Sequence, residues 1–220
     1  IVAFPTIADR TLSEQVNESS GGTFDINLPA TVNSGELLLC VFTYRYGRFN
    51  DGGAPSGWTE LFDTKSGTDG RLWCIYKEAD GTEDGGTISF DADHTGTAGS
   101  MAVIYRVQGW NSVESGRATG TSSGPNPPSL APSWGSDDTL WIAAVGCADD
   151  AASTSAYPTG YGNTNYVNYG GTNSGAMLAY CDKEAAASSE NPAAFTLSEL
   201  EAWVAATIAV EPGTKGAGTT

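Results

Sequence analysis

The sequence repeats one pattern of strand-like runs and turns about 103 residues apart. The turn Pro55-Ser56-Gly57-Trp58 returns as Pro158-Thr159-Gly160-Tyr161, and the apolar run at 37–39 returns at 140–142. Further landmarks repeat with small changes of offset that fall in loops, where insertions cost little. These landmarks are Lys77-Glu78-Ala79 with Lys183-Glu184-Ala185, Phe90 with Phe195, and Ala102-Val103 with Val204-Ala205. A duplication of this kind predicts two modules of the same topology.

Both copies consist of short strand-like runs separated by turn residues. In the first copy, alternating or continuous apolar runs occur at 23–28, 36–44, 58–63, 71–78, 87–91 and 100–107. The 28 glycines and 10 prolines punctuate these runs, which is typical of a turn-rich β fold. The best helical candidate is a short alanine-rich segment at 182–189. We therefore predict an all-β protein of two tandem related β-sandwich modules, jelly-roll-like, packed together.

The predicted module boundaries follow the repeat. The first module covers residues 1–110, the second 111–213, and residues 214–220 form a flexible tail. The Ser-, Gly- and Pro-rich segment 111–134 either takes the place in module two that 9–29 has in module one, or links the modules. The pattern leaves open whether the halves are separate sandwiches or two halves of one larger sandwich. A sister module would cover exposed sheet edges.

The charge balance argues against nucleic-acid and membrane partners. The chain has 26 acidic and 10 basic residues, a net charge of −16. Such a surface repels phosphate backbones, whose binding requires Lys and Arg to displace counterions. No apolar run approaches the roughly 20 residues that span a bilayer. A high net charge of one sign favours solubility at high local concentration, a property that many-copy assembly proteins need.

The four cysteines are predicted to be small buried hydrophobic residues. Cys40, Cys74, Cys147 and Cys181 lie far apart, mostly within strand-like runs, and show no C-x-x-C spacing. That arrangement argues against zinc. A disulfide would require an oxidising compartment, which nothing else in the sequence indicates.

No catalytic or metal-binding constellation stands out. The single histidine, His94, has no marked nucleophile to serve. The loop that starts at Asp91 resembles the beginning of an EF-hand, but Ala102 occupies the position that must supply a bidentate glutamate. The acidic pairs at 83–84, 137–138 and 149–150 leave a looser calcium site as an alternative. We predict no catalytic residue, no metal and no cofactor.

One aromatic and amide-rich stretch is the best candidate for a binding surface. It contains Tyr157, Tyr161, Asn163, Asn165, Tyr166, Asn168 and Tyr169. Tyrosine and asparagine next to glycine are adaptable contact residues, suited to a protein partner or a glycan. The alternative is a turn-rich hairpin with no binding role. Trp73, Trp141 and Trp203 sit within apolar runs and are predicted to be core.

Several strings resemble a domain common in tailed-phage structural and appendage proteins. They are Ser34-Gly35-Glu36-Leu37-Leu38-Leu39, Ala54-Pro55-Ser56-Gly57-Trp58-Thr59, Arg71-Leu72-Trp73-Cys74-Ile75-Tyr76-Lys77 with Ala79-Asp80-Gly81, Val103-Ile104-Tyr105-Arg106, and the closing run at 203–212. The resemblance covers most of residues 30–212, and its motifs are strand and turn signatures. At the second turn Tyr161 stands where the pattern has tryptophan.

The resemblance implies a virion protein of β-sandwich or jelly-roll type, with no catalytic residues attached to the pattern. The favoured role is a capsid decoration (cement) protein on the outer capsid surface, and the acidic charge places such a chain away from packaged DNA. Its expected partners are the major capsid protein or other virion proteins. A homo-oligomer, trimer or dimer, is expected to form through exposed strand edges and the Tyr/Asn stretch. The alternative is a tail- or fibre-associated module that binds a receptor or glycan.

Overall fold

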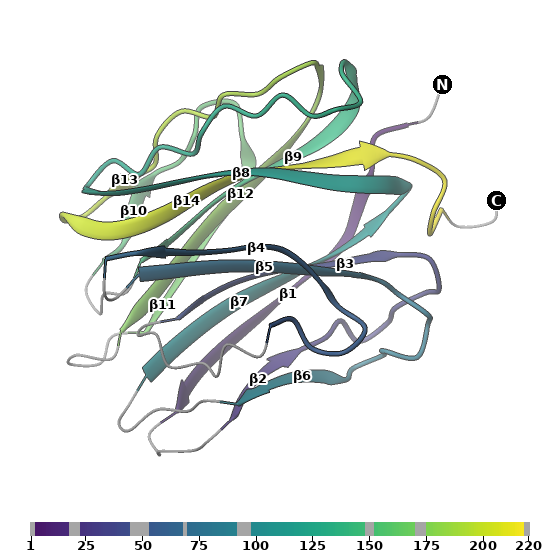
Figure 1. Cartoon of the computed structure of the whole chain (residues 1–220), viewed down its shortest axis with the longest axis horizontal. Coiled ribbons are helices and arrows are strands. Elements are labelled where there is room, and N and C mark those ends of the chain that lie inside the picture. Colours follow the sequence, from purple (N-terminus) through teal and green to yellow (C-terminus); the bar gives the residue numbers. More distant parts are fainter. Residues whose placement is uncertain are drawn as a thin grey trace.

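The computed structural model describes residues 3–17, 23–44, 53–67, 70–91, 98–147, 152–169 and 175–217. These residues form strands and no helix, so the predicted all-β fold is confirmed. Two five-stranded sheets face each other, and a two-stranded sheet lies on the outer side of each (Figure 1). The helical candidate at 182–189 lies mostly in a strand instead, because residues 182–187 pair one for one with a neighbouring strand of the sheet.

The first half of the chain supplies one large and one small sheet. The large sheet, called sheet one, has the order β1-β7-β3-β5-β4, and β2 pairs with β6. The bounds are β1 (Thr6–Asn17), β2 (Thr23–Asn27), β3 (Leu37–Tyr44), β4 (Thr59–Ser66), β5 (Gly70–Glu78), β6 (Thr87–Asp91) and β7 (Ala98–Gln108). All six strands expected in this half form, with ends that differ by a few residues.

The second half builds the same arrangement. Sheet two has the order β8-β14-β9-β12-β11, and β10 pairs with β13. The bounds are β8 (Trp110–Ser122), β9 (Asp137–Cys147), β10 (Thr154–Ala156), β11 (Gly162–Tyr169), β12 (Ala176–Ala187), β13 (Thr196–Leu197) and β14 (Glu201–Pro212). When the strands are counted from β1 in sheet one and from β8 in sheet two, the two large sheets have the same strand order.

Register and turn geometry repeat as well. Leu37 pairs with Glu78, and Leu140 pairs with Glu184, the residues matched in the repeat. The Trp58 N–H donates to the Pro55 carbonyl at 2.9 Å, as the Tyr161 N–H does to the Pro158 carbonyl at 3.2 Å. Each turn contains a glycine at positive φ, Gly57 at 84° and Gly160 at 83°, a conformation that favours glycine. The predicted duplication is thus confirmed in strand order, register and turn.

One predicted correspondence is wrong by a single residue. Leu37 pairs with Val107 and Leu140 with Val210, so Ala102 corresponds to Ala205 and not to Val204. Because neighbouring strand residues point to opposite faces, a shift of one residue exchanges the two sides of the sheet. Ala102 and Ala205 both lie in outer cores, whereas Val204 lies between the large sheets.

Three apolar cores lie between the four layers. The central core joins residues of both large sheets, among them Val41 and Ile142. An outer core between sheet one and the β2–β6 pair contains Phe42 and Phe90, whose rings stack at 5.5 Å. The other outer core, around Phe195, lies between sheet two and the β10–β13 pair. Each module is therefore a sandwich by itself and also one half of a larger shared sandwich.

The contacts between the large sheets occur in exchanged pairs. Strand β1 contacts β11, and its counterpart β8 contacts β4; β7 contacts β12, and β14 contacts β5. The counterpart strands β3 and β9 contact each other. This is the pattern of an approximate two-fold axis between the modules, as in an isologous dimer. Counterpart residues meet there: a Cβ on Gly146 would lie 2.6 Å from the Oγ1 of Thr43.

The segments 111–134 and 214–217 both take part in the fold. Strand β8 occupies the first half of 111–134 and matches β1, so that segment takes the place of 9–29, as one alternative held. At the other end, the Lys215 N–H donates to the Trp110 carbonyl at 3.2 Å, and the Gly109 N–H donates to the Lys215 carbonyl at 2.9 Å. The start of the predicted tail thus packs on the β7–β8 connection, and 218–220 lie outside the described residues.

Candidate functional site

The predicted Tyr/Asn surface lies on and beside an edge strand of sheet two. Tyr157 and Tyr161 precede β11, and the other five residues of the set belong to it. Strand β11 ends the sheet order, and among the described residues it pairs with β12 alone. Most of its residues are exposed. The sequence pattern left open whether this stretch is a loop or a strand, because the many polar residues of 162–169 are also typical of turns.

The side chains of β11 lie on two different faces of sheet two. Asn165 pairs with Tyr180 and Val167 with Leu178, both in the central core, so this face looks toward sheet one. Tyr166 pairs with Ala179 and lies on the opposite, outer face with Asn168. The seven predicted residues therefore do not form one surface. They divide into an inner group at the junction of the sheets and an outer aromatic group.

The inner group joins a polar cluster that ties the two modules together. The Nη2 and Nε atoms of Arg10 on β1 lie 2.8 and 3.1 Å from Oδ2 of Asp182 on β12. The other carboxylate oxygen, Oδ1, accepts from the Asn163 amide at 2.7 Å. The Asn165 amide donates to the Tyr180 hydroxyl at 3.2 Å. We call Arg10, Asp182, Asn163, Asn165 and Tyr180 the inter-sheet cluster.

Sequence reasoning found only the two asparagines of this cluster. Arg10 and Asp182 are 172 positions apart, and no local pattern links them. One signal was present: Asp182 directly follows the apolar run 176–181, so a carboxylate at that point of a buried strand requires a partner. The side chain of Asp182 is only 4% exposed, and that of Arg10 is 27% exposed. The identity of the partner depended on how the sheets dock.

The outer group is partly packed into the module-two core. The Tyr157 ring contacts Phe195 edge-on at 5.8 Å, and burial raises the pKa of Tyr157 to about 12. Tyr161 packs on the same core, as its counterpart Trp58 packs on that of module one, with the Lys183 ammonium 4.9 Å from the Tyr161 ring. Tyr166 is the most accessible of these rings, at 38% exposure.

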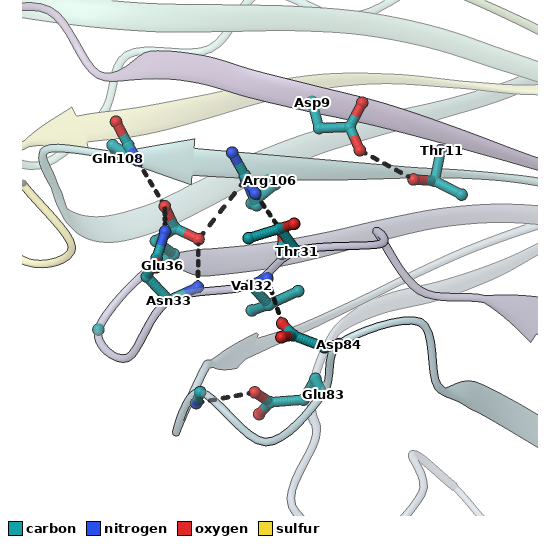
Figure 2. Close-up of polar contacts among 12 residues, drawn as sticks. Asp9, Thr11, Thr31, Val32, Asn33, Glu36, Glu83, Asp84, Arg106 and Gln108 are labelled. Atoms are coloured by element: carbon teal, nitrogen blue, oxygen red, sulfur yellow. Dashed lines mark hydrogen bonds and ion pairs between the residues drawn. The ribbon is translucent and has the colours of Figure 1, made fainter.

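A second buried carboxylate organises the start of β3 (Figure 2). The side chain of Glu36 is fully buried, accepts from the Asn33 N–H at 2.7 Å and from the Gln108 amide at 2.5 Å, and lies 3.5 Å from the Nε of Arg106. Burial by itself would raise the pKa of Glu36. The hydrogen bonds from Asn33 and Gln108 and the charge of Arg106 outweigh it, so the pKa lies below its ordinary value of 4.5.

Acid should therefore weaken the fold through Glu36. Because its folded pKa lies below 4.5, the carboxylate contributes stability that is complete above about pH 4.5 and is lost as pH falls through the folded pKa. We expect Glu36→Gln to lower the free energy of unfolding at pH 7 by about 2 kcal/mol, since it replaces charge-assisted bonds. Below pH 4.5 the difference from the parent should shrink.

Urea titrations at pH 7 and at a series of acidic values measure this difference. The exposed Glu199 supplies the control, because Glu199→Gln removes a carboxylate that is not buried. A deficit of Glu36→Gln that is as large in acid as at pH 7 would contradict the assignment.

The third buried carboxylate, Glu83, holds a turn. It lies 2.6 Å from the Lys77 ammonium and accepts the N–H groups of Asp80 and Gly81 at 3.0 and 2.9 Å. Module two has a matching pair, Lys183 with Glu190 at 2.8 Å. Burial would raise the pKa of Glu83, but the bonds from Lys77 and the turn N–H groups lower it. All three buried carboxylates among the described residues thus serve as acceptors within the fold.

The acidic pairs are also used locally where they are described. An Asp84 oxygen accepts the Val32 N–H at 2.5 Å, and Asp137 accepts the Asp138 N–H at 2.8 Å. Within the described ranges, no group of three or more His, Cys, Asp or Glu residues is placed to hold a metal ion. His94 and the pair at 149–150 lie outside the described residues.

The cysteines behave as predicted. All four are buried thiols. Burial raises the pKa of the Cys40 and Cys181 thiols well above the ordinary value, so both remain neutral and unreactive near neutral pH.

Comparisons with known protein families, curated proteins and solved structures give no match to this chain. Across the described part of the chain there is no helix with the length and apolar character required to cross a bilayer.

Proposed function

We propose that the chain is a non-catalytic structural protein of a tailed-phage virion, a decoration protein that binds the outer capsid surface and stabilises the shell. The observation that carries the proposal is the use of the buried carboxylates. Glu36, Glu83 and Asp182 each have both oxygens engaged by cations, amides or backbone N–H groups of the fold. None is held ready for a substrate, as a general acid or base must be.

The architecture supports the same role. Three apolar cores and an inter-module ion pair favour a rigid body, and the charge of −16 suits a surface exposed to solvent and remote from packaged DNA. A decoration protein stabilises by mass action: it binds the assembled lattice and not the free subunit, which shifts the equilibrium toward the intact shell. The partners proposed on this basis are the major capsid protein or other virion proteins.

Copy number in purified virus particles tests the proposal. Quantitative mass spectrometry of particles from the source culture should find this chain in hundreds of copies, because a decoration protein covers the whole shell. A handful of copies would place it in a tail or fibre. Its absence from particles would contradict a virion role altogether.

A second function, glycan or receptor binding by a tail-associated module, is favoured by one observation. The 38% exposed Tyr166 ring and the Asn168 side chain share the outer face of β11. The Asn168 Nδ2 donates to the Ala152 carbonyl at 3.2 Å, and its Oδ1 beside the tyrosine ring is suited to accept from a sugar hydroxyl stacked on that ring. If this function holds, Tyr166→Ala will reduce signals on a glycan array at least tenfold, since one ring contributes about 1.4 kcal/mol or more. Tyr76→Ala, a half-buried tyrosine of β5, serves as the control.

A further inference from the structure

Strand β11 differs from the other edges of the two large sheets. The edge strands are β1, β4, β8 and β11. The first three carry charged residues, namely Asp9, Arg10 and Glu14 on β1, Glu60, Asp63 and Lys65 on β4, and Glu114 and Arg117 on β8. Strand β11, Gly-Asn-Thr-Asn-Tyr-Val-Asn-Tyr, carries none. Charged residues on edge strands prevent pairing with other chains, so β11 lacks the usual protection.

The uncharged edge is also regular over five residues. Residues 165–169 pair with β12 one for one, and the irregularity of this pairing is confined to the stretch before Asn165. A regular edge directs alternate N–H and C=O groups outward, where another strand can pair with them. Within the described residues, no strand pairs with this side of β11.

The sequence of this stretch is complementary to itself. It reads Asn165-Tyr166-Val167-Asn168-Tyr169. If a second copy is placed antiparallel about Val167, Tyr166 lies opposite Asn168 of the other copy, and Asn165 lies opposite Tyr169. Every asparagine then faces a tyrosine, and Val167 faces itself. Directly opposed side chains of this kind contribute to sheet pairing, and no like charges meet.

We propose that β11 is a self-association edge: two copies of this chain pair antiparallel through residues 165–169, centred on Val167, and continue sheet two across both chains. A second copy is the fitting partner because the stretch 165–169 is complementary to itself and carries no charge, although each chain carries −16. Close approach of two such chains is repulsive, and the uncharged edge is where that repulsion is least. The self-association proposal does not rest on the virion role. If the chain proves to be a monomer that binds capsids, self-association is refuted and the decoration role stands.

A charge-exchange series tests both the pairing and its register. Sedimentation velocity from about 1 µM to about 1 mM, which spans the dissociation constants of small interfaces, should show a dimer forming. The double variant Tyr166→Glu with Asn168→Glu places like charges opposite one another and should weaken dimerisation at least tenfold. Tyr166→Lys with Asn168→Glu places opposite charges there and should restore it. Circular dichroism melting of each variant separates lost pairing from lost folding.

Disulfide trapping gives a second, independent readout. Val167→Cys brings a thiol opposite its own copy at the two-fold axis, within the distance that a disulfide needs, and mild oxidation should give a covalent dimer. Thr164→Cys lies on the same strand but does not face itself, so it should stay monomeric on the same gel. A chain that is monomeric up to the highest concentration, a trimer, or a dimer unaffected by the paired glutamates would overturn the proposal.

Discussion

Replacement of Gly146 by threonine is expected to lower the free energy of unfolding by about 3 kcal/mol, the upper range for overpacking a well-filled core. Gly146 lies on β9 at the approximate two-fold axis, facing its counterpart Thr43 on β3. A Cβ at this position would lie 2.6 Å from Thr43 Oγ1 and 3.1 Å from a methyl group of Leu72. Both neighbours are fully buried, so neither can move away without disturbing the central core. Urea-induced unfolding measures the loss.

The approximate two-fold relation predicts a second substitution that restores stability to Gly146→Thr. Thr43 is paired with Leu72 as Gly146 is with Leu178, and the Thr43 hydroxyl donates to the Arg71 carbonyl at 2.8 Å. Exchange of the two residues, Thr43→Gly with Gly146→Thr, moves the larger side chain to the equivalent position in the other module. We expect the exchange variant to be more stable than Gly146→Thr alone by about 2 kcal/mol, the scale of coupling between residues in contact.

Gly162→Ala supplies the control for these variants. Gly162 also lies on a strand of sheet two, but no atom lies within 4 Å of the position its Cβ would take. This variant should change the free energy of unfolding by less than about 0.5 kcal/mol. An exchange variant as unstable as Gly146→Thr would show that the two positions are not equivalent.

The second large effect is expected at the inter-sheet cluster. Arg10→Met removes the cation next to Asp182. The Asp182 carboxylate, which is 4% exposed, then keeps the hydrogen bond from the Asn163 amide but has no cation beside it among the described residues. Loss of one partner of a fully buried pair costs about 3–5 kcal/mol. Water reaches the 27% exposed Arg10 side chain, so we expect about 2 kcal/mol here. Thermal and urea unfolding at pH 7 measure the change.

A paired variant shows that the cost comes from the unpartnered charge. Addition of Asp182→Leu to Arg10→Met removes that charge and should recover part of the loss. Arg117→Met, which removes an exposed guanidinium lying 5.5 Å from the Phe62 ring, is the control and should cost less than about 1 kcal/mol. If Arg10→Met is no more harmful than Arg117→Met, the ion pair does not hold the modules together.

The sequence by itself determined the class of fold and its duplication. Strand alternation and turn chemistry are local properties that each copy encodes independently. Equivalent residues therefore occupy equivalent places in the two modules, as Leu37 and Leu140, Lys77 and Lys183, and the two Pro-x-Gly turns do. Strands β1 and β8 were missed as strands. Both are edge strands, one rich in charge and the other in Ser, Gly and Thr, and partial burial leaves only a weak alternation.

Only the tertiary structure decided how the modules meet. A continuous apolar run such as β3 shows that both faces of a strand are covered, but not which layer covers each face. The docking of sheet one on sheet two brought Thr43 to Gly146 and Arg10 to Asp182, residues more than a hundred positions apart. It also divided the Tyr/Asn stretch between two faces. These pairings depend on the relative position of two separately encoded sheets, which no local pattern contains.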